Sequence, residues 1–316
     1  MKLIIQIPCY NEEGALPVAL KALPKKIKGI AKIETMIIDD GSADNTIEVA
    51  QKNGVKHIAK HVSNQGLARA FITGLDRALR EEADIIVNTD ADNQYNADDI
   101  EKLVEPILKG RADLVIGTRP ISDTKHFSFS KKVLQKIGSW VVRVASGSDV
   151  KDAPSGFRAI SRNAAMQLNV FSSYTYTLET IIQAGHKGIS VLSVPIRTNE
   201  DLRPSRLVKS IPSYLRQSML TIVRSLMAYS PFRFFTIPGI ISFIAGFVIG
   251  IRFLVYYITD GGAGHIQSLI LASVLLGSGI FLIIIGLIAD LISVNRKLLE
   301  QIDFRLKRIE LNNGKK

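Results

Sequence analysis

The sequence of 316 residues contains one cysteine, Cys9, so no disulfide can form within the chain. We expect Cys9 to be a small buried residue rather than a nucleophile. The glycine patterns G-x-G-x-x-G and G-x-x-x-x-G-K-[ST] are both missing, which argues against dinucleotide-binding and P-loop enzymes. The five histidines do not have the spacing of a zinc site, and we expect His57 and His61 to lie on the surface.

A secretory signal peptide is also missing, because Met1 to Pro8 is short and leads into a turn-rich segment. We therefore expect the N-terminal domain to remain unexported. Acidic residues are absent between Arg203 and Arg233, although the chain carries a net charge of +11. The cations of this segment directly precede an apolar stretch, which favours an anionic membrane surface over nucleic acid as the partner. They are Arg203, Arg206, Lys209, Arg216, Arg224 and Arg233.

Two long apolar runs follow this basic segment. Residues 234–251 and 266–289 are uncharged, and each run is long enough to cross a bilayer as a helix. Two buried core helices are the alternative, but runs of this length without a polar face argue against it. Arg252 lies near the outer end of its span, where its side chain can reach the headgroups. The loop 259–265 has no Lys or Arg while both outer flanks are basic, which predicts that both termini face the cytoplasm.

These patterns divide the chain into four parts. We expect a catalytic domain at 1–206, an amphipathic interfacial segment at 207–231, a transmembrane hairpin at 232–293 and a basic cytoplasmic helix at 294–316. The spans and the C-terminal helix would be the surfaces for any homo-oligomer.

The first part alternates strand and helix patterns. Strands are predicted at 3–8, 35–39, 55–60, 84–89 and 113–118, and helices at 15–23, 46–53, 66–82 and 97–109. This alternation is typical of an α/β domain, with a mainly parallel sheet covered by helices on both faces. Such sheets bind ligands at the carboxyl ends of their strands.

Acidic motifs stand at those ends. Pro8-Cys-Tyr-Asn-Glu-Glu13, Asp39-Asp-Gly-Ser42 and Asp90-Ala-Asp-Asn-Gln94 each follow a predicted strand. Each alone could be a turn or a helix cap. Together they predict carboxylates that converge on one crevice, where repulsion favours a bound cation. Oxygen ligands of this kind suit Mg²⁺ or Mn²⁺.

The same motifs, with Asn64-x-Gly66 and Ser155-Gly-Phe-Arg158, resemble family 2 glycosyltransferases of the GT-A fold, which is Rossmann-like. Ser155-Gly-Phe-Arg158 narrows the resemblance to the branch of dolichol-phosphate mannose synthase and bactoprenol glucosyltransferase. The resemblance covers residues 3–210, and the two-span tail is similar to that of bacterial members.

The resemblance implies a role for each matching residue. Nucleotide-sugar binding would fall to Pro8, Tyr10, Asn11, Glu12, Asp39, Asp40, Asp90 and Ala91. The metal would be held by Asp90, Asp92 and Gln94, and the catalytic residues would be Asp90, Asp92 and Arg158. Phosphate groups on the acceptor side would be bound by Arg119, Ser155, Arg158, Arg203, Arg206 and Lys209. The family motif Arg-x-x-Gly-x-Ser-Lys reads Arg203-Pro-Ser-Arg-Leu-Val-Lys209 here, so the roles of these cations stay open. Glu179 matches an acid common in the family, and it could equally be a helix charge.

The resemblance implies a metal-dependent, inverting transfer of one hexose from a UDP- or GDP-linked donor to undecaprenyl or dolichyl phosphate. The expected location is the cytoplasmic face of the cell membrane. A processive polysaccharide synthase is one alternative, although such enzymes usually carry Gln-x-x-Arg-Trp and more spans, and the only tryptophan here is Trp140 in another context. The other alternative is a membrane scaffold with a decayed transferase domain, which the intact Asp90, Asp92 and Gln94 argue against.

Overall fold

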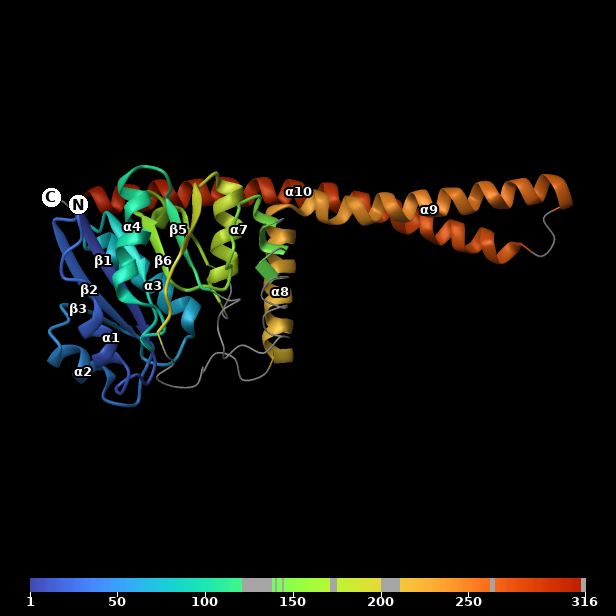
Figure 1. The fold of residues 1–316 in the computed structure, drawn as a ribbon. Coiled ribbons are helices and arrows are strands. Elements are labelled where there is room, and N and C mark those ends of the chain that lie inside the picture. The colour runs from blue at the N-terminus through green and yellow to red at the C-terminus, as the bar shows by residue number, and fades with distance from the viewer. Residues whose placement is uncertain are drawn as a thin grey trace. The chain divides into compact units, whose positions relative to one another are not determined.

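A computed structural model describes residues 1–120, 138–139, 141–143, 145–170, 175–199, 211–261 and 265–313. The chain divides into two compact units. The first combines Met1–Ile222 with Phe304–Lys316, and the second is Val223–Asp303 (Figure 1).

The first unit is built on a seven-stranded sheet. Its strands are β1 (Lys2–Cys9), β2 (Lys32–Asp39), β3 (His57–Lys60), β4 (Ile85–Asn88), β5 (Leu114–Thr118), β6 (Arg158–Ser161) and β7 (Val191–Pro195). They lie in the order β3-β2-β1-β4-β6-β5-β7. All pairings are parallel except those of β6, which runs antiparallel to both β4 and β5. The prediction of a mainly parallel sheet is confirmed.

Helices connect and cover these strands. They are α1 (Leu16–Ala22), α2 (Thr46–Lys52), α3 (Leu67–Arg80), the short 3-10 helix η1 (Ala97–Asp99), α4 (Ile100–Leu108), α6 (Arg162–Gln167) and α7 (Thr177–Lys187). Helix α3 packs on β1 and β2, and α4 packs on β5 and β6. Strands β1, β4 and β5 are buried, mostly apolar runs, as expected where helices cover a parallel sheet.

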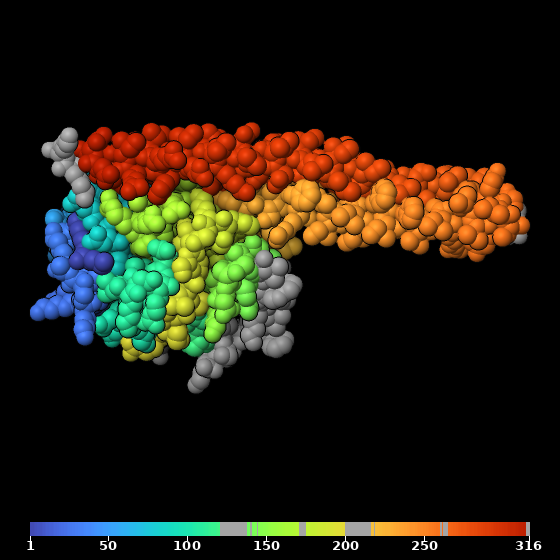
Figure 2. Space-filling view, turned by 90° about the horizontal axis from the view of Figure 1, so that it is seen from above, coloured from blue at the N-terminus to red at the C-terminus, as the bar shows by residue number. Residues whose placement is uncertain are grey.

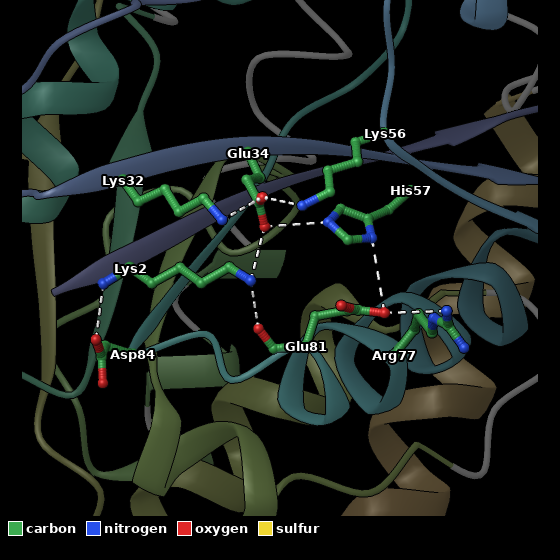
Figure 3. A network of polar contacts seen from close by, with 8 residues as sticks. All are labelled: Lys2, Lys32, Glu34, Lys56, His57, Arg77, Glu81 and Asp84. Atoms are coloured by element: carbon green, nitrogen blue, oxygen red, sulfur yellow. Dashed lines mark hydrogen bonds and ion pairs between the residues drawn. The ribbon is translucent and has the colours of Figure 1, made fainter.

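Glu34 on β2 is the centre of an ion-pair network near the amino ends of the strands (Figure 3). Its carboxylate lies 2.7 Å from Nζ of Lys2, 2.9 Å from Nζ of both Lys32 and Lys56, and 3.0 Å from Nε2 of His57. His57 is buried here, and His61 is buried beside Asp40, so the prediction that both lie on the surface was wrong. The network joins β1, β2 and β3 at the end of the sheet opposite the acidic motifs.

The second unit contains most of a helical hairpin. The long helices are α8 (Ile211–Tyr229), which crosses the boundary between the units, α9 (Pro231–Asp260) and α10 (Ile266–Asn313). Helices α9 and α10 are long and apolar enough to cross a membrane, with mean hydropathies of 2.2 and 2.6 over their most apolar windows. Only 17% of each window is buried, so most of this apolar surface faces outward. Helix α10 continues without a break through the expected boundary at residue 293.

Small residues let α9 and α10 approach closely. A Cβ atom on Gly279 would lie 2.8 Å from the carbonyl oxygen of Gly239, and one on Gly246 would lie 3.0 Å from that of Ala272. The buried positions of α10 recur every seven residues, at Ala272, Gly279, Gly286 and Ser293. Contacts between small residues are the usual means of packing helices in lipid, where no hydrophobic force draws them together.

The last turns of α10 belong to the first unit. Leu311, Lys307 and Glu310 line a shallow hollow together with residues of α3, and Lys307 Nζ donates to Oδ1 of Asn169 at 3.1 Å. Figure 2 shows this red end of α10 over part of the surface of the first unit.

Candidate active site

The segments after β1 and β2 are joined by hydrogen bonds. Asn11 donates from its backbone N to Oγ of Ser42 at 2.9 Å, and its own Oδ1 accepts from the backbone N of Ala43 at 2.8 Å. Glu12 donates from its backbone N to Oγ1 of Thr46 at 2.8 Å. These bonds fix Asn11 in a left-handed conformation (φ 55°), which asparagine tolerates better than most residues. The first two motifs therefore form one structural element.

Asp39 and Asp40 are buried, and their carboxylates bind the protein. Asp39 accepts from the backbone N of Ser42 at 3.3 Å. Asp40 accepts from the backbone N of Gln65 at 2.9 Å and of Gly66 at 2.8 Å, and lies 2.7 Å from Nδ1 of His61. Asp40 thus links the end of β2 to the turn before α3, which gives the Asn64-Gln-Gly66 motif a structural role.

Gly41 allows the same turn to close. Its φ is +73°, and a Cβ atom there would lie 2.6 Å from the backbone carbon of Ser63. A side chain would both strain the backbone and overlap the neighbouring chain. The glycine of Asp39-Asp-Gly-Ser42 is therefore a requirement of the fold.

The acidic motifs converge as predicted for neighbouring strands, because β2, β1 and β4 are adjacent. The electrostatic surroundings of Cys9, at the end of β1, show this convergence. Burial raises the pKa of its thiol well above the usual value, and the charges of Glu12, Asp39, Asp44 and Asp90 raise it further. Carboxylates from the ends of all three strands thus lie within electrostatic range of one buried sulfur atom. The expectation that Cys9 is buried is confirmed.

The Asp90-Ala-Asp-Asn-Gln94 loop follows β4. Ala91 is buried, whereas Asp90, Asp92 and Gln94 are partly exposed. Asn93 is left-handed (φ 57°), and the backbone N of Gln94 donates to Oδ1 of Asp92 at 3.1 Å. Two carboxylates and an amide oxygen are too few for a closed protein cage. They fit Mg²⁺ or Mn²⁺, which commonly bind one or two carboxylates and complete their coordination with water and substrate phosphates.

Gly156 brings the Ser155-Gly-Phe-Arg158 motif against this loop. A Cβ atom on Gly156 would lie 3.3 Å from Oδ1 of Asp90 and 2.9 Å from the hydroxyl of Tyr176. The backbone N of Gly156 donates to the hydroxyl of Tyr95 at 3.1 Å. The carbonyl oxygen of Gly156 accepts from Nδ2 of Asn88 at 2.9 Å. Glycine is therefore needed for the close approach to Asp90.

Asn88, Tyr95 and Tyr176 form a buried polar floor under these motifs. Asn88 donates from Nδ2 to the hydroxyl of Tyr176 at 2.8 Å and accepts from Nε2 of Gln6 at 2.9 Å. Tyr176 stacks on Phe71 with centroids 3.8 Å apart. Sequence reasoning missed all three floor residues. The amide of Asn88 at the end of the otherwise apolar strand Ile85–Asn88 was an available signal, because a buried polar group needs partners.

Arg158 is completely buried beneath the site. Its Nε and Nη2 donate to the carbonyl oxygens of Ser155 (2.8 Å) and Ala153 (2.9 Å), and Nη1 donates to Oγ1 of Thr180 (2.6 Å). Burial lowers its pKa to about 10, against the opposing effect of Tyr176, Tyr95, Asp152 and Asp90, so it stays charged near neutral pH. A direct contact of Arg158 with a phosphate group stays a prediction.

Arg119 follows β5 and pairs with the buried Asp152. Burial alone would lower the pKa of Arg119, but Tyr95, Asp152 and Asp90 outweigh it and raise the pKa. Ser155 is buried too, and among the described residues no partner is present for its Oγ or for Oγ1 of Thr118. The two arginines thus bring positive charge to the same region as Asp90.

The remaining candidates are placed as follows. Pro8 is buried within β1, Tyr10 is 42% exposed just beyond it, and Glu179 is buried in the first turn of α7. Arg203, Arg206 and Lys209 lie outside the described residues. The roles expected for all of these side chains stay predictions.

Residues 4–168 match the model of a known family, glycosyl transferase family 2. The chain belongs to this family. It is a glycosyltransferase with a GT-A fold, as the motifs implied.

Two relatives named as polyprenyl-phosphate glycosyltransferases match this chain over most of their own length. The chain is 33% identical to UDP-N-acetylglucosamine–dolichyl-phosphate N-acetylglucosaminyltransferase of Methanococcus voltae, over 61% of this chain and 83% of that protein. It is 26% identical to polyprenol monophosphomannose synthase of Mycolicibacterium smegmatis, over 69% and 84%. Glucosyl-3-phosphoglycerate synthase of Mycobacterium tuberculosis, solved with Mn²⁺, UDP and glucosyl-3-phosphoglycerate, shares the fold. Its TM-score is 0.55 at 19% identity, over 71% of this chain and 79% of that one.

Proposed function

We propose that this glycosyltransferase moves one hexose from a UDP- or GDP-linked donor to a polyprenyl phosphate, undecaprenyl or dolichyl, with inversion at the anomeric carbon. The observation that carries the proposal is the close approach of Gly156 to Asp90. It joins the motif expected to bind the donor diphosphate to the motif expected on the acceptor side. Relatives whose names specify dolichyl-phosphate and polyprenol acceptors support the class of acceptor.

Asp90, Asp92 and Gln94 would hold Mg²⁺ or Mn²⁺ beside the donor diphosphate. A divalent ion there supplies positive charge against the charge that develops on the leaving group. The related fold that was crystallised with Mn²⁺ and UDP supports this assignment. Asn11 and Glu12, fixed by the segment after β2, would shape the nucleotide side of the site.

The acceptor phosphate needs orientation more than deprotonation. A phosphomonoester loses its second proton near pH 6, so it already carries nucleophilic oxygens at neutral pH. Arg158, whose donors bind protein oxygens, would add positive charge from beneath. Arg203, Arg206 and Lys209 would bind the lipid phosphate directly, since arginine matches the geometry of phosphate oxygens.

The lipid substrate explains the apolar helices. A polyprenyl chain stays in the bilayer, so a catalytic domain that uses it must be held at the membrane surface. Helices α9 and α10 would form this anchor, and α8 would lie in the interface with Met219 and Leu220, both exposed, toward the lipid. The basic flanks of the two apolar runs support a cytoplasmic location for the domain.

The test is a screen of radiolabelled UDP-glucose, GDP-mannose and UDP-N-acetylglucosamine against undecaprenyl and dolichyl phosphate, followed by analysis of the lipid product. We expect one donor to give a lipid that carries a single sugar. A polymeric product would favour a processive synthase instead. If no donor were either transferred or hydrolysed, the result would contradict enzymatic function.

A further inference from the structure

The chain after β7 runs back along the loop Asp90–Gln94, which is expected to hold the metal. Thr198 forms an antiparallel bridge with Tyr95, and the backbone N of Asn96 donates to the carbonyl of Arg197 at 3.2 Å. The backbone N of Asn199 donates to the carbonyl of Gln94 at 2.8 Å. These pairings lie immediately beyond Asp92.

The side chain of Asn199 extends the same contact. Its Nδ2 donates to the carbonyl of Asn93 at 2.9 Å and to that of Tyr95 at 3.4 Å. One residue therefore binds three consecutive carbonyl groups of the loop that carries the expected metal ligands. Asn93 is left-handed, a conformation that asparagine tolerates, and these bonds hold the loop in it.

An ion pair anchors the returning segment two residues earlier. Arg197 donates from its backbone N to Oδ2 of Asp99 at 2.6 Å and from Nη2 to Oδ1 at 2.8 Å. Asp99 is completely buried, and burial alone would raise its pKa, but the bonds from Arg197 and Lys102 outweigh this and lower it. The position of Asn199 is thus fixed from a charged, buried point of the fold.

We propose that Asn199 is a positioning residue for the divalent metal. Its amide holds the backbone at 93–95 so that Asp92 and Gln94 face the bound ion together. This inference rests on the proposed function, since it assumes that the loop binds a metal with the donor diphosphate. Asn199 would act through this backbone and not as a ligand of the ion.

The test compares Asn199→Asp and Asn199→Ala with the wild-type protein. The Asp variant has the same shape but sets a carboxylate oxygen against two carbonyl oxygens, and the Ala variant removes the donor without repulsion. The backbone bond to Gln94 survives in both. Asn53→Asp is the matched control, because Nδ2 of Asn53 also donates to a backbone carbonyl, that of Val49 at 2.8 Å, at the exposed end of α2.

The readout is Mn²⁺ binding to each purified full-length protein, measured from the electron paramagnetic resonance signal of free Mn²⁺ with UDP or GDP present. We expect the affinity for Mn²⁺ to fall about tenfold in Asn199→Asp, the change that corresponds to the loss of one or two hydrogen bonds. The affinity should fall less in Asn199→Ala. Asn53→Asp should bind as wild type does. Transfer by Asn199→Asp should recover when Mn²⁺ is raised, and its thermal unfolding without metal should remain a single cooperative transition.

The outcomes separate the two proposals. Wild-type protein that binds no Mn²⁺ with either nucleotide and transfers sugar in excess EDTA would overturn the metal-dependent function. Wild-type binding that Asn199→Asp and Asn199→Ala both retain in full would overturn the positioning role alone. Should Asn199→Asp fail to fold, Asn199→Ala, which adds no charge, decides the question by the same measurement.

Discussion

Arg119 forms a two-point ion pair with the completely buried Asp152, with Nε 2.8 Å from Oδ2 and Nη2 3.0 Å from Oδ1. The backbone N of Arg119 also donates to Oδ2 at 3.3 Å. Asp152 therefore fixes both the backbone and the side chain of the first residue after β5, next to the site.

Breaking this pair should be costly. We expect Asp152→Ala to lower the free energy of unfolding by about 3–5 kcal/mol, because it leaves the largely buried Arg119 without its carboxylate. The double variant Arg119→Met/Asp152→Ala should lose less than the sum of the two single variants. Thermal or urea unfolding in detergent, followed by circular dichroism, measures all three. Strict additivity would mean that the two side chains are energetically independent.

Asp92→Ala should abolish sugar transfer and leave the fold intact, because it removes one of two carboxylates expected to hold the metal. Asp98→Ala is the matched control, since Asp98 lies six residues further on and its side chain is 77% exposed. Steady-state transfer assays with and without EDTA check the prediction. Near-normal turnover of Asp92→Ala, or full wild-type activity in excess EDTA, would sink the metal assignment.

Membrane topology gives a third prediction, which is that both termini lie in the cytoplasm. The loop between the apolar helices has no Lys or Arg, whereas both flanks are basic. In a Cys9→Ser background, an impermeant thiol reagent applied to intact cells should label Ala263→Cys and spare Asn313→Cys. The reverse pattern would refute this orientation.

The Glu34 network predicts a pH-dependent stability. Burial would raise the pKa of Glu34, but bonds from Lys2, Lys56, Lys32 and His57 outweigh this and hold the pKa well below its usual range. The carboxylate is therefore more acidic in the folded than in the unfolded state. Its contribution is complete above the unfolded pKa of about 4.3 and is lost as the pH falls below it toward the folded pKa.

We expect Glu34→Gln to lower the free energy of unfolding at pH 7 by about 1.5–3 kcal/mol, the usual worth of hydrogen bonds to a charged group. The difference from wild type should shrink only as the pH is lowered below about 4. Glu105→Gln, which breaks an exposed pair with Lys109, should change stability little. Unfolding curves from pH 3 to pH 8 measure both variants. A difference that stays constant down to pH 3 would contradict the assigned shift.

Much of the first unit could be predicted from the sequence, because short apolar strands and amphipathic helices carry clear periodicity. Strand β1, predicted at 3–8, spans Lys2–Cys9, and α2, predicted at 46–53, spans Thr46–Lys52. The antiparallel strand β6 was not predicted. Its four residues, Arg158–Ser161, show no periodicity, and their pairing depends on partners far away in the sequence.

Part of the candidate site could also be predicted from the sequence, and part could not. Neighbouring parallel strands bring Glu12, Asp39 and Asp90 together, and this could be predicted because each motif follows a strand of the same sheet. The partners of Arg119 and Arg158 could not be predicted, because Asp152 and Thr180 lie 33 and 22 residues away in the sequence and meet the arginines only in the folded chain. Burial was also misjudged for His57, since Glu34, which pairs with it, lies on another strand.

The position of β6 has a consequence for the order in which the chain folds. Strands β3, β2, β1 and β4 pair among themselves, so a chain emerging from the ribosome can assemble them early. Among the described residues, the partners of strand β5 are β6 and β7, both of which are synthesised later. Until β6 arrives, one edge of β4 has no partner strand, and an open edge of this kind attracts other chains. We therefore expect the half of the sheet that contains β3, β2, β1 and β4 to form first. The nascent protein should need a chaperone most in the interval before β6 inserts.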